Sequence, residues 1–509
     1  MIFCLLLSSS FLSASEEMTT AEKISQNIDA FFEPIVQVLD SVIFFDPFDA
    51  VGLGIEGVKI PFVVIWLIFG SLFFTIRMGF INLSGFKHAI DLVRGKYDDP
   101  NAKNDGEVSH FQALATALSA TVGLGNIAGV AVAISLGGPG ATFWMILAGF
   151  IGMASKFVEC TLGVKYRTVD KNGIVSGGPM YYLSSALAQK GPIFGYLGKG
   201  LAVLFCILCV GGSFGGGNMF QANQAYAQLA NVAPFLEGKS LYFGIFLAIA
   251  VGIVIIGGIR SIAKVTEKIV PLMCGIYIIA ALAIIAVNIT EFPYVIQRII
   301  TGAFSHEAVT GGAIGVLIVG FQRAAFSSEA GIGSASIAHS TAKTKEPISE
   351  GMVALLEPFI DTIVVCTLTA SVIIFSGAYD VGDETVEGTS LTSAAFASVI
   401  PWFPYVLAVA ISLFAFSTMI SWSYYGLKAW EFLFGNSRLA DLTYKMLFLI
   451  FVVIGASINL GAVVDFSDMM ILGMAFPNVI GLLLLSKEIR SDLMEYWQKI
   501  KDGRIKRFK

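Results

Sequence analysis

Long apolar runs separated by short polar stretches make up most of the chain. Each run has about the 20 residues that a helix needs to cross a bilayer. The pattern therefore predicts an all-α polytopic membrane protein with about 11 transmembrane helices. The predicted spans are residues 58–80, 111–136, 141–164, 199–231, 240–258, 269–289, 310–338, 350–376, 395–427, 443–463 and 466–486.

Two of these spans contain paired glycines at which a helix is expected to break. Gly123-Leu124-Gly125-Asn126 in one span matches Gly331-Ile332-Gly333-Ser334 in another. Each glycine costs a helix about 0.5–1 kcal/mol relative to alanine. A break exposes backbone groups at bilayer depth, where they must line a cavity or bind something polar. Such paired breaks indicate the binding site of a secondary transporter; the alternative is that the glycines only allow close helix packing.

The order of the spans suggests an internal repeat. Without the first span, ten remain, and they divide into two groups of five. An odd number of spans per group inverts the second group, which places a binding site at the midplane. We therefore expect one N-terminal helix plus a 5+5 inverted repeat with two broken helices. The predicted parts are a candidate signal peptide at 1–15, a periplasmic or interfacial segment at 16–57, an extra transmembrane helix at 58–80, a first five-helix repeat at 111–289, a second at 310–486 and a basic cytoplasmic tail at 487–509.

Composition and charge fit this architecture. Hydrophobic residues make up 56% of the chain and charged residues 14%, whereas about a quarter of the residues of a soluble domain are charged. Lys and Arg concentrate in the loops that lie inside when the N-terminus lies outside, as the positive-inside rule requires. We expect a multi-pass protein of the plasma (inner) membrane, with its N-terminus outside and its C-terminus in the cytoplasm. Its environment is the lipid bilayer; no nucleic-acid partner is expected, and the oligomeric state is not predictable.

Catalytic and metal motifs give no support for an enzyme. Cys206 and Cys209 form a C-x-x-C motif, but apolar neighbours favour core packing over a redox or metal site. The four histidines are not at metal-ligand spacing, and no metalloprotease motif, phosphate loop or Ser–His arrangement lies in the spans. A transporter-like amino-acid sensor remains an alternative, but no soluble stretch is long enough to carry a signal. Proton coupling remains a second alternative, because Glu329 can titrate.

Five short motifs accompany the two breaks. They are Gly123–Ala131, Ser176–Tyr182, Gly217–Asn223, Phe326–Gly331 and Trp422–Gly426. Together they resemble the alanine or glycine:cation symporter family, over residues 55–490. The resemblance implies sodium-coupled import of alanine or glycine by alternating access, through the inverted five-plus-five fold of the bacterial leucine transporter. Sodium would be the coupling ion, and no other cofactor is expected.

An amino-acid zwitterion at the midplane needs partners for both of its charges. Helix N-termini and free N–H groups attract a carboxylate, and C-terminal carbonyls attract an ammonium. We expect N–H groups near Gly123, Gly125 and Asn126 to hold the carboxylate, and carbonyls between Phe321 and Ser328 to hold the amine. The full set of predicted substrate-binding residues is Thr121, Gly123, Gly125, Asn126, Gln221, Phe321, Ser327, Ser328 and Trp422.

Two of these side chains have alternative explanations. Trp422 lies one turn beyond Thr418 and would limit the cavity to a small side chain, but a packing role fits it as well. Gln221 is a buried amide that an amino acid can satisfy, and a hydrogen bond between helices would satisfy it equally.

Adjacent hydroxyls indicate the sodium site. A hard cation prefers oxygen ligands, and the resemblance implies that the side chains of Ser417 and Thr418 bind sodium together with carbonyls near Ser119 and Val122. Without the resemblance, a Ser–Thr pair in a span more often bonds to its own helix.

Charged residues inside the spans suggest a gating or stabilising network made of Arg323, Glu329, Glu357 and Asp361. Glu357 and Asp361 lie one turn apart and repel each other unless a cation joins them, and Arg323 is the expected partner. Lys156 and Glu159, three residues apart, are expected to form a structural pair.

Overall fold

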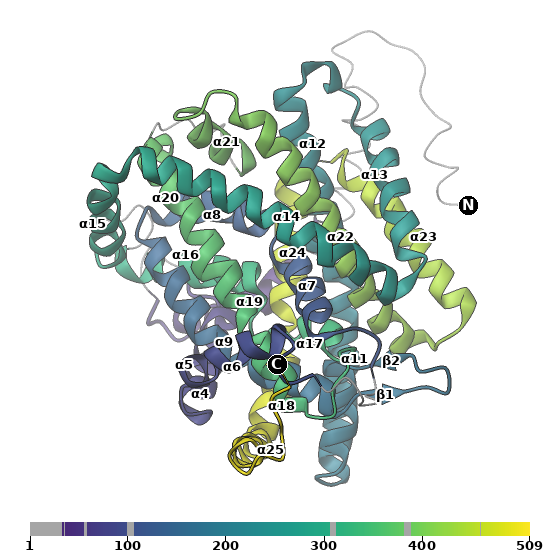
Figure 1. Ribbon diagram of the computed structural model, residues 1–509. Coiled ribbons are helices and arrows are strands. Elements are labelled where there is room, and N and C mark those ends of the chain that lie inside the picture. Colours follow the sequence, from purple (N-terminus) through teal and green to yellow (C-terminus); the bar gives the residue numbers. More distant parts are fainter. Residues whose placement is uncertain are drawn as a thin grey trace.

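The computed structural model describes residues 33–508, apart from 35, 55–58, 99–105, 306–311, 381–387 and 459. The predicted signal peptide, residues 1–15, lies outside the described residues. The described chain is predominantly helical, and its only named strands are two short ones, β1 and β2 (Figure 1).

The elements up to the end of the first predicted repeat follow in chain order. They are α3 (Pro47–Ala50), α4 (Phe62–Arg77), α5 (Ile81–Ser84), α6 (Phe86–Val93), α7 (His110–Thr121), η1 (Leu124–Asn126), α8 (Ala128–Gly137), α9 (Ala141–Lys165), β1 (Thr168–Val169), β2 (Val175–Ser176), α10 (Pro179–Tyr181), η2 (Tyr182–Ala186), α11 (Pro192–Phe214), η3 (Gly215–Met219), α12 (Phe220–Val232), η4 (Pro234–Leu236), α13 (Ser240–Ile255), α14 (Gly258–Val287) and η5 (Ile289–Glu291).

The remaining elements belong to the second half of the chain. They are α15 (Phe292–Ala303), α16 (Gly312–Ser328), α17 (Ala335–His339), α18 (Pro347–Ala354), α19 (Leu356–Pro358), η6 (Phe359–Cys366), α20 (Thr367–Ser376), η7 (Ala378–Asp380), α21 (Thr389–Ala397), α22 (Phe403–Phe434), α23 (Arg438–Gly455), α24 (Leu460–Gly473) and α25 (Ala475–Lys501).

Several described helices are long and apolar enough to cross a membrane. Six pass this test alone, a seventh is the bent pair of α7 and α8, and three shorter apolar helices add to them: α4, α13 and α16. These helices support a multi-pass membrane protein, while the count of 11 spans stays a prediction. The predicted span 395–427 is wrong in its bounds, because α21 ends at Ala397 and α22 begins only at Phe403, beyond Pro401.

Both predicted helix breaks are present. The first follows α7, which starts with a capping box between Ser109 and Gln112; the halves on either side of this break are bent by 57°. The second separates α16, ending at Ser328, from α17, which begins at Ala335. The prediction of two interrupted helices is therefore confirmed.

The two breaks lie against each other in the centre of the molecule. η1 contacts α16, and α9 packs along α16, α17 and α18. A Cβ atom on Gly125 would lie 3.5 Å from the Cα atom of Ser327. Residues about 200 positions apart in sequence thus share one interior region.

The molecule has two opposite faces, which we call the hairpin face and the vestibule face. The hairpin face carries β1 and β2, the start of α7 and residues 340–346; Val108 pairs there with Ala342. Figure 1 shows this face low in the view, with α21 at the top. The vestibule face is the other end, where α8 finishes at Gly137 and α16 begins.

The hairpin face is closed by hydrogen bonds to backbone carbonyl groups. The guanidinium of Arg167 donates to the carbonyls of Ser340, Ala342 and Thr344 at 2.8, 2.6 and 2.9 Å. The N–H of Lys343 donates to the carbonyl of Val108 at 2.8 Å. These bonds fix the loop after α17 against the segment before α7.

Candidate functional site

The first break is held open by side chains in place of the helical hydrogen-bond ladder. The N–H of Gly123 donates to the Asn126 Oδ1 atom at 2.8 Å, and Asn126 Nδ2 donates to the Asp361 carboxylate at 2.5 Å. A Cβ atom on Gly123 would lie 2.5 Å from the Thr418 hydroxyl. Glycine is therefore required here by the close approach of α22.

Three of the four predicted sodium ligands meet at this break. The Thr418 hydroxyl donates to the Ser119 carbonyl at 3.0 Å, and the Ser119 hydroxyl donates to the Ser417 carbonyl at 2.6 Å. The Ser417 hydroxyl bonds to its own helix, at the carbonyl of Phe414. Val122, the fourth, is buried one turn beyond Ser119. Neutral oxygen atoms of α7 and α22 thus gather where α7 ends.

The second break is shaped by left-handed backbone. Glu329, Gly331 and Gly333 have φ angles of 54°, 85° and 97°. The Glu329 carboxylate accepts a hydrogen bond from Ser334 and another, at 3.1 Å, from the indole Nε1 of Trp422. A non-glycine residue with positive φ is uncommon, and here the side-chain bonds of Glu329 hold it in place.

Asp361 joins the two breaks. Its carboxylate accepts hydrogen bonds from Asn126 of the first break, from the Ser327 hydroxyl at 2.8 Å and from the Thr362 hydroxyl at 2.7 Å. Asp361 lies in η6, a π-helical stretch, a feature that is common at functional sites. Its hydrogen-bond donors among the described residues are neutral.

Gln221 and Trp422 lie beside the breaks. The Gln221 amide donates to the carbonyl of Gly216 at 2.9 Å and accepts a long, 3.5 Å contact from the N–H of Leu124. Trp422 is 1% exposed and packs on Gly217, where a Cβ atom would lie 2.3 Å from its ring. The π-helical segment η3 therefore makes room for the indole.

Other predicted substrate residues point elsewhere. The Phe321 ring packs on Trp144 of α9, with ring centroids 6.4 Å apart. The hydroxyls of Thr121 and Ser328 bond back to the carbonyls of Ala117 and Ala324 in their own helices.

Phe326, which was not predicted as a site residue, faces the first break instead. Its ring lies 3.6 Å from the position of a Cβ atom on Gly125 and makes an edge contact with Phe220. Helix geometry could have indicated this difference. Five residues turn a helix by about 140°, so Phe326 and Phe321 lie on different sides of α16.

The charged residues pair differently from the prediction. Arg323 forms an ion pair with Asp468 of α24 at 3.0 Å, so its expected pairing with Glu357 and Asp361 is wrong. The Lys156 ammonium lies 3.2 Å from Glu357 as well as 3.6 Å from Glu159. The cation that pairs with Glu357 is therefore Lys156 of α9.

A cavity of about 600 Å³ opens at the vestibule face. It is lined by the end of α8, the start of α16, α24 and part of the N-terminal segment, and its polar lining includes Asp40, Lys59, Gln322, Arg323, Asp465 and Asp468. Arg323 precedes Ser328 by five residues, or about 7.5 Å along a helix. The Arg323–Asp468 pair is thus part of the cavity wall, about one and a half turns of α16 from the second break.

A broken-helix site of this kind, within a bundle of apolar helices, defines the class of secondary transporters. Residues 51–509 match the model of the sodium:alanine symporter family, and the chain belongs to that family. The sodium/alanine symporter AgcS of Methanococcus maripaludis is 42% identical over 438 residues, covering 85% of this chain and 93% of the relative.

Two further comparisons were found. The probable sodium/glutamine symporter GlnT of Bacillus subtilis is 36% identical over 445 residues, covering 87% of this chain and 89% of the relative. The crystal structure of MhsT in complex with L-phenylalanine aligns with a TM-score of 0.49 at 17% identity, over 75% of this chain and 99% of the other.

Proposed function

We propose that this protein is a sodium-coupled symporter that imports a small neutral amino acid, alanine or glycine, by alternating access. In this proposal the vestibule face is outside, the hairpin face is cytoplasmic, and the two halves of the chain form the inverted five-plus-five repeat. Membership of the sodium:alanine symporter family supports the proposal.

The observation that carries the proposal is the oxygen cluster at the first break. Thr418, Ser119 and Ser417 present hydroxyl and carbonyl oxygens to one another across α7 and α22. Such neutral oxygen ligands suit a hard monovalent cation. Sodium binding would exchange these hydrogen bonds for ion contacts and so tie α7 to α22.

The substrate follows from the surroundings of the same break. Backbone dipoles at two broken helices suit a zwitterion. Trp422 and Phe326, from α22 and α16, are large rings beside the breaks, and in this proposal they restrict the ligand to a small side chain. The Gln221 amide, weakly bonded at its oxygen, is available to orient the ligand.

The vestibule supplies the route and the outer gate. The cavity holds both acidic and basic side chains, which suits a zwitterion and a cation entering together. In this proposal the Arg323–Asp468 pair, which borders the cavity, is the outer gate and separates when the site opens to the vestibule face.

The proposal is tested by sodium-driven uptake of labelled alanine into vesicles. Thr418→Ala removes one proposed ligand, so we expect the sodium concentration for half-maximal uptake to rise by about tenfold, equivalent to about 1.4 kcal/mol. Thr418→Ser should restore the wild-type value. Ser412→Ala is the matched control, because Ser412 lies on α22 but bonds to its own helix at Ala408.

Two results would contradict the proposal. Uptake by the wild type that is independent of sodium would exclude sodium coupling. An unchanged sodium dependence in Thr418→Ala would remove the oxygen cluster as the sodium site.

A further inference from the structure

A second cluster of ionisable side chains is buried between the second break and the hairpin face. It consists of His110 of α7, Lys156 and Glu159 of α9, His339 of α17, Glu350 of α18 and Glu357 of α19. Five of these residues are 0% exposed and His110 is 7% exposed. The proposed symport cycle does not use this cluster. Buried charges are costly unless they are compensated, so a cluster of six ionisable residues is expected to have a function.

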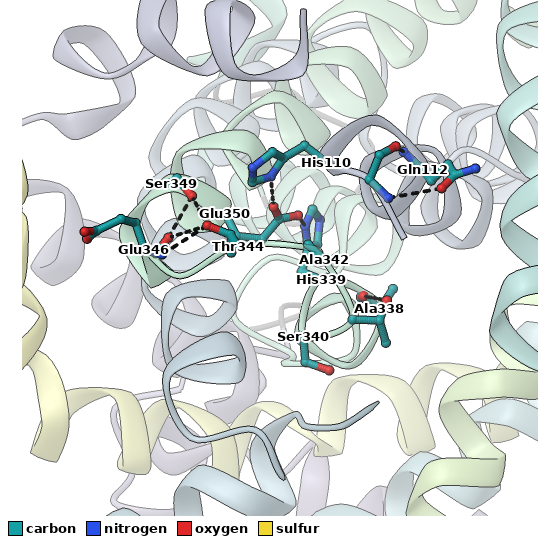
Figure 2. Close-up of polar contacts among 12 residues, drawn as sticks. His110, Gln112, Ala338, His339, Ser340, Ala342, Thr344, Glu346, Ser349 and Glu350 are labelled. Carbon is teal, nitrogen blue, oxygen red and sulfur yellow. Dashed lines mark hydrogen bonds and ion pairs between the residues drawn. The ribbon is translucent and has the colours of Figure 1, made fainter. Parts of the chain in front are cut away.

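His339 is held between two carboxylates. Its Nδ1 atom lies 2.5 Å from Glu350 and its Nε2 atom 2.5 Å from Glu357. The other oxygen of Glu350 contacts the Nδ1 atom of His110; Figure 2 shows the His110 ring directed at the carboxylate, with His339 beside it. The contacts form a continuous line from Glu357, deep in the protein, to His110 at the hairpin face.

This arrangement requires an additional proton. A neutral imidazole has one N–H donor and one acceptor nitrogen, so between two ionised carboxylates one of its contacts would set lone pair against lone pair. Both contacts are hydrogen bonds when the group holds one proton more, either on His339 or on one carboxylate. Glu350, His339 and Glu357 are therefore positioned to share one additional proton.

The charge balance leads to the same conclusion. Lys156 is the one permanently charged cation of the cluster, whereas Glu159, Glu350 and Glu357 are acids, and Glu329 of the second break acts on Lys156 from nearby. Proton binding reduces the excess of negative charge in the dry interior. Among the described residues, the other ionisable groups facing the cluster are Cys160 of α9, Tyr182 of η2, Asp361 of η6, Tyr425 of α22 and Asp98 ahead of α7.

A metal ion fits this position less well than a proton. Ligand atoms of Cys160, His339 and Glu357 lie within 4.8 Å of one another. However, the Lys156 ammonium is 3.2 Å from Glu357, and both ring nitrogens of His339 already have carboxylate partners. A metal cation there would be repelled by the ammonium and would have to displace Glu357 from His339.

The cluster also lies at the closure of the hairpin face. His339 is the last residue of α17, and the loop that follows it is the one fixed by Arg167 and Val108. Moving α17 away from α18 and α19 separates the imidazole from its carboxylates. The hydrogen bonds that need the additional proton are then lost.

We propose that this cluster is a proton-binding site whose loaded form holds the hairpin face closed, and that opening this face releases the proton through Glu350 and His110 to the adjacent solution. When the proton leaves, the group is left with a neutral imidazole and two ionised carboxylates. This inference rests on the proposed function for its assignment of the hairpin face to the cytoplasm. Acid on that side stabilises the closed form, so transport slows as internal pH falls.

The test uses right-side-out membrane vesicles with a fixed inward sodium gradient and labelled alanine. We expect wild-type uptake to be at least about threefold slower at an internal pH near 6 than near 8, the range in which histidine titrates. The same change outside should have little effect. His339→Gln and Glu350→Gln should each lose the dependence on internal pH. His88→Gln is the control, because His88 contacts Tyr496 away from the cluster.

Alanine binding separates failure of the proton site from failure of the proposed function. Sodium-dependent alanine binding by the purified variants shows that they are folded, because binding from the vestibule does not require the hairpin face to open. If a variant that binds alanine keeps the wild-type slope with internal pH, the proton site is overturned. Stoichiometric metal that disappears in His339→Gln would also overturn it. Absence of sodium-dependent alanine binding by the wild type would overturn the proposed function instead.

Discussion

The two helix breaks occupy matching positions in the sequence but are built differently. The first has no charged side chain of its own, and its backbone is held by the amide of Asn126 and by the oxygen contacts of Thr418 and Ser119. The second uses three residues with positive φ and anchors the carboxylate of Glu329 to Trp422 and Ser334. Neutral hydrogen bonds can be exchanged for ligand contacts at low cost, whereas a charged, left-handed turn is fixed in shape.

The difference assigns separate roles to the two breaks. The first is suited to bind sodium and substrate, because its present hydrogen bonds are replaceable. The second is suited to transmit movement, because α17 leads directly from it to His339, in the buried cluster that we propose binds a proton, and to the closure of the hairpin face. Asp361 bonds to both breaks, so we expect a change at one break to affect the other.

The largest effect is expected from Gly123→Ala. The new Cβ atom would lie 2.5 Å from the Thr418 hydroxyl, which forces apart the oxygen atoms that we propose bind sodium. Alanine uptake should fall by about a hundredfold or more, equivalent to about 2.7 kcal/mol or more, while the protein remains folded. Gly129→Ala, on α8 with no atom within 4 Å of the new Cβ atom, should transport normally. Wild-type uptake by Gly123→Ala would refute a binding role for the first break.

A smaller effect is expected from Asp361→Asn. The amide of asparagine has one acceptor oxygen and one N–H₂ donor in place of two acceptor oxygens. It therefore cannot accept from Asn126 at one atom and from Ser327 at the other. The connection between the breaks should weaken, lowering the maximal uptake rate by about tenfold. Alanine affinity, measured by equilibrium binding, should stay within a few-fold of wild type. An unchanged rate would show that the breaks are not coupled through this residue.

Gly333→Ala should act on stability more than on binding. Its φ of 97° is unfavourable for alanine, and the new Cβ atom would lie 2.7 Å from Pro179. We expect a loss of about 1–3 kcal/mol of stability, seen as a lower melting temperature in detergent. Gly275→Ala, on α14 with open space around it, is the control. If Gly333→Ala instead abolished sodium binding at wild-type stability, the contrast between the breaks would be wrong.

The smallest effect concerns acid stability outside both breaks. Burial lowers the pKa of His88 from 6.5 to about 4, against the opposing effect of the Asp91 carboxylate. The unfolded chain therefore binds this proton more readily, so stability falls as pH drops from about 6.5 toward 4. His88→Gln should show a shallower decline in melting temperature across that range. If the melting temperature of His88→Gln declined as steeply as that of the wild type, the acid sensitivity would come from other groups. The stability of this control at acid pH also shows whether unfolding contributes to the internal-pH experiment.

Local backbone preferences were visible in the sequence. Gly123 and Gly333 marked the breaks because glycine disfavours helix and permits unusual φ. The family resemblance led to the prediction that Ser417 and Thr418 bind sodium, and the structure brings their helix to the first break.

The pairing of charges could not be predicted in the same way. Arg323 binds Asp468, 145 residues further on, and His110 meets Glu350, 240 residues away. Such contacts depend on how each helix is rotated about its axis, which hydrophobic runs that are apolar on all sides do not specify. The interruption before α22 was missed for a related reason, since residues 395–402 are apolar enough to read as a continuous span.

The three hydrogen bonds that Arg167 donates to carbonyl groups bear on how tightly ion and substrate movement are coupled. One rigid guanidinium holds Ser340, Ala342 and Thr344 at once, so its withdrawal breaks all three bonds together. Conformations in which the hairpin face is only partly open should therefore be rare. In the sodium-coupled cycle that we propose, this rarity would limit slippage, because an ion could rarely cross without the amino acid.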